Sequence, residues 1–263
     1  MNSTEEKIIG YVEGTIGWIV FNNPAKRNAV SLDMWRALPT VIARLEADPG
    51  IRVIVLRGAG DQAFVAGADI SKFEDERKSP ETRKRYEEVE DEALGRLENT
   101  SFPTIAMIHG FCMGGGVAIA LACDLRYAAD DALFAIPAAR LGIAYPSPIL
   151  KKLIEIAGVA VAGELLFTAR RFSAVEAEKR GLVNDVLPKS ELEASVRATA
   201  ASISENAPLT IRAAKQTMKE LAKGAAADLT LCDRLIAECF DSADYVEGYR
   251  AFLEKRKPLF RGR

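Results

Sequence analysis

The sequence predicts an α/β protein in which a core over residues 1–190 precedes a helical region over residues 191–263. Two observations support this prediction. Strand-like and helix-like segments alternate over the first two-thirds of the chain, and from Lys189 onward the pattern is helical almost to the end. The boundary between the two regions is soft, because neither an internal repeat nor a low-complexity linker marks it.

The individual elements are predicted from local residue patterns. Runs rich in apolar and β-branched residues predict strands, and helices are predicted where capping residues precede a periodic apolar pattern. The predicted strands are Ile8–Val12, Ile16–Phe21, Val53–Arg57, Thr104–Ile108, Leu125–Tyr127 and Leu133–Ala135. The predicted helices are Ser31–Ala47, Pro80–Thr100 after the N-cap Ser79, Val117–Cys123, and two that begin at the capping boxes Ser173–Glu176 and Ser190–Glu193.

The composition is that of an ordinary globular protein. With 35 basic and 37 acidic residues the net charge is −2, which gives no general attraction to nucleic acid or to an anionic membrane. Glu5, Glu6 and Lys7 stand where a signal peptide would need an apolar run, so we expect a cytoplasmic location. We expect no metal site, because the four cysteines lack C-x-x-C spacing and His109, the only histidine, has the position of a hydrogen-bonded structural residue.

The most informative segment is the uncharged stretch Gly110–Cys123, with the sequence GFCMGGGVAIALAC. Its three consecutive glycines, Gly114–Gly116, are predicted to form a turn between a buried strand and a buried helix. Free N–H groups at such a turn bind negative charge. A second turn of small residues, Ala66–Ile70, would supply another backbone donor, and two donors that converge on one oxygen form an oxyanion hole for a carbonyl or thioester.

Three further segments have simpler interpretations. Gly58–Ala63 matches G-x-G-x-x-A, but the residues after it are a poor helix start, so we reject dinucleotide binding. The mostly charged tract Lys72–Glu92 predicts a solvated helix, with a lid beside the site as the alternative. The basic tail Lys255–Arg263 is either a solvated terminus or a phosphate-binding segment with Phe252 or Phe260 beside it.

Several blocks of the sequence together resemble the crotonase (enoyl-CoA hydratase/isomerase) superfamily. They are Phe21–Ala29 (FNNPAKRNA), Phe64–Ile70 (FVAGADI), His109–Gly116 (HGFCMGGG) and Phe252–Arg256 (FLEKR). The resemblance implies a spiral of ββα units with a helical C-terminal region that drives formation of a homotrimer or a dimer of trimers. It also implies an acyl-CoA substrate, and no cofactor beyond the coenzyme A moiety of that substrate.

The resemblance further assigns roles to single residues. The backbone N–H groups of Ala68 and Gly115 would bind the thioester oxygen. The coenzyme A side of the site would contain Arg27, Ala66, Asp69, Ile70, and, from the same or a neighbouring subunit, Phe252 and Lys255.

The departures from the family pattern concern the acid–base groups. Hydratases of this family carry one glutamate two residues after the glycine triplet and another after a later proline, and these positions are Ala118 and Ala138 here. Alanine cannot activate water, and loss of a positioned acid or base costs about 100 to 10,000-fold in rate. Standard hydration is therefore not expected.

Decarboxylation is a reaction that needs an enolate-stabilising hole but no initiating base. Segments around Leu141–Pro146 and Gly163–Ala169 resemble the methylmalonyl-CoA decarboxylase branch, in which a tyrosine occupies the position of Tyr145; that branch carries histidine at Ala68. We therefore favour decarboxylation of a malonyl-type acyl-CoA. Hydration or isomerisation with atypical acid–base residues and non-catalytic acyl-CoA binding remain the alternatives.

Overall fold

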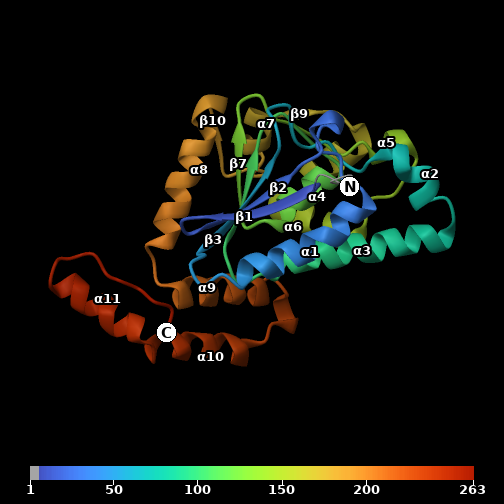
Figure 1. Ribbon diagram of the computed structural model, residues 1–263. Coiled ribbons are helices and arrows are strands. Elements are labelled where there is room, and N and C mark those ends of the chain that lie inside the picture. Colours follow the sequence, from blue (N-terminus) through green and yellow to red (C-terminus); the bar gives the residue numbers. More distant parts are fainter. Residues whose placement is uncertain (1–5) are drawn as a thin grey trace, which may run out of the picture.

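The computed structural model describes residues 6–263, so Glu5, cited above, lies outside the described residues. A six-stranded sheet in the order β1-β2-β3-β5-β7-β10 crosses the centre of the molecule (Figure 1). Only the β1–β2 pair is antiparallel in this sheet. Its strands are β1 (Ile8–Glu13), β2 (Ile16–Phe21), β3 (Val53–Gly58), β5 (Thr104–Ile108), β7 (Leu125–Ala129) and β10 (Asp185–Leu187).

A second, smaller sheet has the order β4-β6-β8-β9. Its strands are β4 (Ala63–Val65), β6 (Phe111–Met113), β8 (Leu133–Ala135) and β9 (Phe172–Ser173). Only β8 was predicted. Strands of two or three residues are too short to display a period of two, so the sequence pattern could not reveal the others.

The helices cover both faces of the main sheet, because side chains of each strand alternate between the faces. On β3, Ile54 and Leu56 join the larger apolar cluster, which α1, α3, α4 and α6 complete, whereas Val53 and Val55 face α8. The helices that form the body are α1 (Leu32–Glu46), α2 (Phe73–Glu76), α3 (Pro80–Glu98), α4 (Gly115–Ala122), α5 (Ala138–Leu141), α6 (Ser147–Thr168), α7 (Ala174–Lys179) and α8 (Lys189–Ser204).

Two of the three serines predicted to cap helices are confirmed in that role. The Ser79 side chain accepts the N–H of Thr82 at the start of α3, and Ser173 forms a capping box with Glu176 at the start of α7. The predicted capping box at Ser190 is wrong. The helix α8 begins one residue earlier, directly after Pro188, so Ser190 lies inside the helix and caps nothing.

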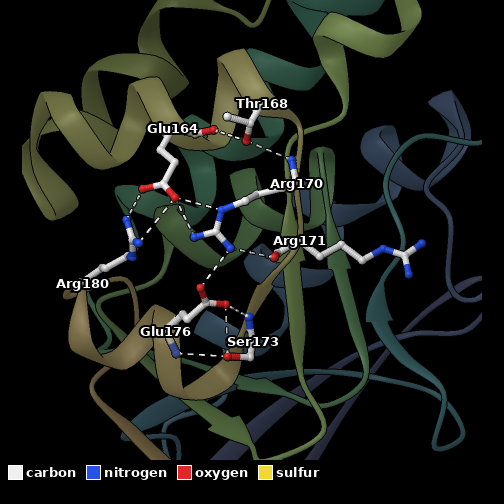
Figure 2. A network of polar contacts seen from close by, with 7 residues as sticks. All are labelled: Glu164, Thr168, Arg170, Arg171, Ser173, Glu176 and Arg180. Atoms are coloured by element: carbon white, nitrogen blue, oxygen red, sulfur yellow. Dashed lines mark hydrogen bonds and ion pairs between the residues drawn. The ribbon is translucent and has the colours of Figure 1, made fainter.

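Charged residues fasten the end of α6 to α7, as Figure 2 shows. The Glu164 carboxylate accepts from Arg170 at 2.6 Å and also from Arg180, and Arg170 donates to Glu176 at 2.9 Å. The guanidinium groups of Arg170 and Arg180 lie 4.2 and 4.6 Å from the centre of the Phe172 ring. This network fixes the segment that connects α6 with the second sheet.

The last three helices lie below the body in Figure 1, near the C-terminus. They are α9 (Pro208–Leu221), α10 (Leu229–Phe240) and α11 (Ala243–Leu253). By contrast α8, which the sequence assigned to the same region, packs its Leu192, Val196 and Ala200 against the main sheet. This packing joins α8 to the core, and the predicted boundary near residue 190 stays a prediction. Within the described residues, no helix has the length and apolar composition to cross a membrane.

Candidate active site

The glycine turn lies between β6 and α4, and two of its glycines are required by the backbone. Gly114 has a φ of 47° and donates its N–H to the Ala135 carbonyl at 2.8 Å. A Cβ at Gly116 would lie 2.1 Å from the carbonyl oxygen of Val65, so only glycine permits this approach of α4 to β4. The turn therefore presents the N–H of Gly115, the first residue of α4, without an acceptor inside the helix.

The second small-residue turn lies directly opposite. Val30 holds it on both sides, since its N–H donates to the Gly67 carbonyl at 2.8 Å and its carbonyl accepts from Asp69 at 2.9 Å. Within residues 6–263 the Ala68 N–H between them donates to no protein atom. A Cβ built on Gly115 would lie 3.8 Å from the Ala68 nitrogen. The two predicted donors are thus brought together, and two free N–H groups in this arrangement can bind one oxygen that carries negative charge.

A cavity of about 120 Å³ opens in front of these two donors, and we call it the active-site cavity. It contains Ala66, Ala68, Ile70, Gly115 and Tyr145, five of the residues predicted for the site. The rest of its wall comes from β6, from the segment that runs from α2 to α3, and from the segment that runs from β8 to α6. These residues include Phe73, Arg77, Glu87, Glu90, Met113, Ile136, Pro137, Ala138, Leu141, Ile143 and Ile149.

Tyr145 lies beside the glycine turn. Its hydroxyl donates to the Gly114 carbonyl at 3.1 Å, so the phenol oxygen is adjacent to the peptide whose nitrogen belongs to Gly115. The side chain is half-buried. Burial and the nearby charge of Glu90 raise the pKa of the Tyr145 phenol well above its ordinary value. The hydroxyl therefore stays protonated at neutral pH and acts as a hydrogen-bonding group.

The two alanines that replace the expected glutamates lie in different places. Ala138 is part of the wall of the active-site cavity. Ala118 faces a separate space of about 350 Å³ between α3, α4 and α6, which we call the neighbouring cavity. Its wall includes Asp91, Leu94, Gly95, Glu98, Ala118, Leu121, Ile149, Lys151, Lys152 and Glu155. Only one of the two substitutions thus changes the wall of the active-site cavity.

The sequence prediction missed Arg77 and Glu90, which come from the tract interpreted as a solvated helix. Glu90 is 7% exposed and lines the active-site cavity. Burial raises the pKa of its carboxyl to about 7, although the Arg77 cation lowers it. A signal was present, because Tyr86, Glu90 and Leu97 recur at helical spacing and all three are buried on one face of α3.

Arg77 completes this side of the cavity. Its guanidinium carbon lies 3.7 Å from the centre of the Tyr86 ring and 4.5 Å from that of Phe73. In the described part of the chain, its buried Nε has no hydrogen-bond partner. The position of Tyr86 is fixed by a hydrogen bond, because its hydroxyl accepts the indole N–H of Trp35 at 2.8 Å. The cavity therefore holds a cation and a carboxyl group on a rigid aromatic support.

Of the residues predicted for the coenzyme A side, Ala66 and Ile70 line the cavity, whereas Asp69 and Arg27 do not. Burial raises the Asp69 pKa, but hydrogen bonds from Lys26 at 2.7 Å and Ser71 at 2.6 Å outweigh this effect and hold the pKa below its ordinary value. It caps the short helix η2 (Ile70–Lys72), since its side chain accepts the N–H of Ser71. Arg27 lies outside the cavity, with its guanidinium 4.9 Å from the centre of the Phe111 ring.

Phe252 and Lys255 are not brought to the cavity within this chain. Both are exposed at the end of α11, which lies on the far side of the body from α2 and α5 in Figure 1. Their contribution from a neighbouring subunit stays a prediction. His109 is buried, but its Nε2 has no hydrogen-bond partner in the described residues, contrary to the expected hydrogen-bonded role.

The fold thus opposes two free backbone N–H groups over a cavity of about 120 Å³, an arrangement that can bind the carbonyl oxygen of a thioester. Known proteins agree with this description. Residues 12–263 match the family described as enoyl-CoA hydratase/isomerase. The short-chain-enoyl-CoA hydratase of Clostridium acetobutylicum is 35% identical over 249 residues, which is 93% of this chain and 94% of that protein. The crotonyl-CoA hydratase of Syntrophomonas wolfei is 33% identical over 259 residues, 97% of this chain and 98% of the relative.

Solved structures give the same result. The crystal structure of an enoyl-CoA hydratase/carnithine racemase from Magnetospirillum magneticum superimposes with a TM-score of 0.93 at 36% identity, and covers 99% of this chain and 97% of its own. The chain belongs to the enoyl-CoA hydratase/isomerase family, the crotonase superfamily, and is an enzyme that acts on acyl-CoA thioesters. The predicted fold is confirmed.

Proposed function

We propose that the protein decarboxylates a malonyl-type acyl-CoA through an enolate held by the N–H groups of Ala68 and Gly115. The observation that carries this proposal is the position of the Tyr145 hydroxyl, 3.1 Å from the Gly114 carbonyl and next to these two donors. Ala138 leaves no carboxylate at the second glutamate position in the same cavity wall. The cavity thus retains enolate stabilisation and lacks the usual group that positions water.

The reaction follows from these contacts. The thioester oxygen accepts from both N–H groups, and the Tyr145 hydroxyl turns its single O–H from the Gly114 carbonyl to one oxygen of the substrate carboxylate. The bond between the α-carbon and that carboxylate breaks, its electron pair forms the enolate, and carbon dioxide leaves. The negative charge develops on the oxygen between Ala68 and Gly115, where fixed backbone dipoles stabilise it without reorganisation. A proton then adds to the α-carbon and completes the product acyl-CoA.

One assay separates this reaction from its nearest rival. Purified protein is incubated with methylmalonyl-CoA, ethylmalonyl-CoA and crotonyl-CoA, and the products are identified by mass spectrometry. We expect loss of carbon dioxide from the first two. Rapid hydration of crotonyl-CoA with no change in the malonyl-type substrates would show that the proposed reaction is wrong.

Hydration or isomerisation is the second candidate, and the names of the hydratases from Clostridium acetobutylicum and Syntrophomonas wolfei favour it. Non-catalytic binding of acyl-CoA is the third. The variant Tyr145→Phe removes one hydroxyl and keeps the ring, so it tests whether turnover of a malonyl-type thioester depends on that hydroxyl. We expect at least a tenfold loss of turnover with unchanged coenzyme A affinity. Tight binding without turnover of any thioester by the unmodified protein would favour the third candidate.

The proposal includes an assembly and a location. We expect a homotrimer or a dimer of trimers in which Phe252 and Lys255 reach the coenzyme A of a neighbouring subunit, with Arg27 beside it. No cofactor besides the coenzyme A moiety is expected, and the cytoplasm is the expected location. The charge variant Lys255→Glu would raise the Michaelis constant for an acyl-CoA and leave that for the corresponding pantetheine thioester unchanged, because the latter lacks the nucleotide.

A further inference from the structure

Glu90 is a buried carboxyl group that the proposed decarboxylation does not yet use. It lies on the inner face of α3 and lines the same cavity as Ala68, Gly115 and Tyr145. Within the described residues no hydrogen bond or ion pair to its carboxyl group is found, not even from the nearby Arg77, and the group lines the cavity. Buried carboxylates are normally paired or hydrogen-bonded, so this one calls for a functional explanation.

The reaction needs a proton at this place. After carbon dioxide leaves, the α-carbon of the enolate must receive one proton inside the cavity. Tyr145 is a poor source, because its pKa is raised well above the ordinary phenol value. Ala138 and Ala118 have no proton to give. Among the described residues that line the active-site cavity, the acidic ones are Glu87 and Glu90, and Glu87 is exposed.

We propose that Glu90 is the catalytic residue that carries the proton to and from the α-carbon of the bound acyl group. In the forward reaction the Glu90 carboxyl gives its proton to the α-carbon, and the enolate electron pair forms the new C–H bond. The carboxylate left behind takes a proton from water after product release. In the reverse sense, the carboxylate removes an α-proton from a saturated acyl-CoA, and the resulting enolate is held by Ala68 and Gly115.

The charged and titratable groups around Glu90 suit this role. Arg77 lies near it, on the segment between α2 and α3, and Glu87 and Asp91 flank it on α3. The phenol groups of Tyr86 and Tyr145 are also close enough to interact with its charge. Burial raises the Glu90 pKa to about 7, so both of its protonation states are populated near neutral pH. An acid–base group is most effective when its pKa lies near the working pH.

This inference rests on the proposed function, since the proton is delivered to the enolate of that reaction. The test uses a reaction that does not depend on decarboxylation. Butyryl-CoA is incubated with the protein in deuterated water, and deuterium at the α-carbon is measured by mass spectrometry. We expect exchange by the unmodified protein and at least a 100-fold slower exchange by Glu90→Gln, with coenzyme A affinity retained. Glu90→Asp, which keeps a carboxyl group, should exchange at an intermediate rate.

A matched control is available on the same helix. Glu88 is exposed, forms only a surface pair with Lys84 at 3.8 Å and lies outside the cavity wall, so Glu88→Gln should exchange at the unmodified rate. A readout that needs no variant is the pH profile of exchange by the unmodified protein, which should rise with an inflection near pH 7. A flat profile between about pH 5.5 and 8.5, no exchange at all, or unchanged exchange by Glu90→Gln would overturn the inference.

The two proposals fail separately. Exchange that depends on Glu90, together with no loss of carbon dioxide from malonyl-type thioesters, would refute the decarboxylation and retain Glu90 as the proton carrier of another enolate reaction. Decarboxylation that persists in Glu90→Gln, with exchange also unchanged, would retain the proposed function and refute the role of Glu90.

Discussion

The active-site cavity and the neighbouring cavity share Ile149 in their walls, yet they hold ionisable groups in different ways. In the neighbouring cavity Lys151 lies 2.8 Å from Glu155, and Lys152 lies 3.8 Å from Glu98. These pairs are partly exposed, so water screens each charge that its partner does not neutralise.

In the active-site cavity Glu90 is buried and Arg77 is half-buried, and neither has such a partner among the described residues. Glu90 and Arg77 face each other without an ion pair, and the Arg77 Nε has no acceptor. Keeping the unpaired Glu90 carboxyl and the Arg77 Nε away from water costs free energy of folding. The comparison teaches that charge count alone does not identify a site. The sequence is charged around both cavities, but only the active-site cavity has a buried, unpaired carboxyl group, that of Glu90, among the described residues.

The largest expected effect tests the backbone side of the active-site cavity. Gly115 is the first residue of α4, a position that tolerates proline, and a Cβ there meets its nearest atom, of Trp35, at 3.5 Å. Gly115→Pro removes one N–H from the proposed oxyanion hole and should lower kcat by about 100 to 1,000-fold. Steady-state kinetics on the preferred thioester would measure it. A thermal unfolding midpoint close to that of the unmodified protein is the control, and full activity would refute the assigned role of this donor.

The next effect concerns stability and its dependence on pH. Since burial raises the pKa of Glu90 from 4.5 to about 7, the folded protein keeps this proton to a higher pH than the unfolded chain. The contribution of Glu90 to the free energy of unfolding therefore falls as the pH rises from about 4.5 to 7. Glu90→Gln carries no charge and should be more stable than the unmodified protein at about pH 8, by up to about 3 kcal/mol, and equally stable near pH 4.5.

Urea unfolding of both proteins at several pH values measures this difference. The exposed Glu88→Gln serves as the comparison, and its free energy of unfolding should follow that of the unmodified protein throughout. A difference between Glu90→Gln and the unmodified protein that does not change with pH would mean that Glu90 is not protonated near neutrality.

A smaller effect is expected in the neighbouring cavity. Gly95 lies inside α3, and a Cβ there would meet nothing within 4 Å. Gly95→Ala should therefore stabilise the helix by up to about 1 kcal/mol, because alanine loses less backbone entropy on folding. Thermal unfolding measures the gain, and turnover should not change. A marked loss of turnover would mean that the two cavities act as one site.

The smallest effect concerns the ion pairs of the neighbouring cavity. Lys151 and Glu155 are one turn apart on α6, and the Lys151 side chain is mostly exposed. Lys151→Ala should cost no more than about 0.5 kcal/mol, and the loss should shrink in high salt. Chemical unfolding at low and high ionic strength would measure both. A loss of unfolding free energy as large as that expected for a buried ion pair would mean that the charges of the neighbouring cavity are not screened by water.

Much of the site was predicted from local sequence. Gly114, Gly115 and most of Ala66–Ile70 line the cavity, as expected from turn chemistry, which depends on a few adjacent residues. Tyr145, which was assigned by the family resemblance, lines it too, and the catalytic roles stay predictions. The start of α3 at Ser79 was predicted for the same reason. The strand β6 was not predicted, since three residues show no periodicity and Gly110 redirects the chain after β5 with a φ of 55°.

The side chains of α3 could not be assigned in the same way. Their charge predicts a solvated surface, and whether Glu90 meets water or a cavity depends on the segments that carry Ala138 and Tyr145, about 50 residues further along the chain. The orientation of Ala118 also depends on packing that the local sequence does not reveal. Its place in the glycine pattern predicts a position in the site, but the rotation of α4 directs it to the neighbouring cavity.

By itself, the sequence determined the α/β order of elements, the family, and a pair of backbone donors at two small-residue turns. These features follow from residue types within short windows, where steric and hydrogen-bonding preferences act locally. Only the tertiary structure decided that Ala68 and Gly115 meet, that Glu90 is buried beside them, and that Phe252 and Lys255 lie far from the cavity in this chain. The reason is that burial, and with it the pKa of a carboxyl group, is set by packing between segments distant in sequence.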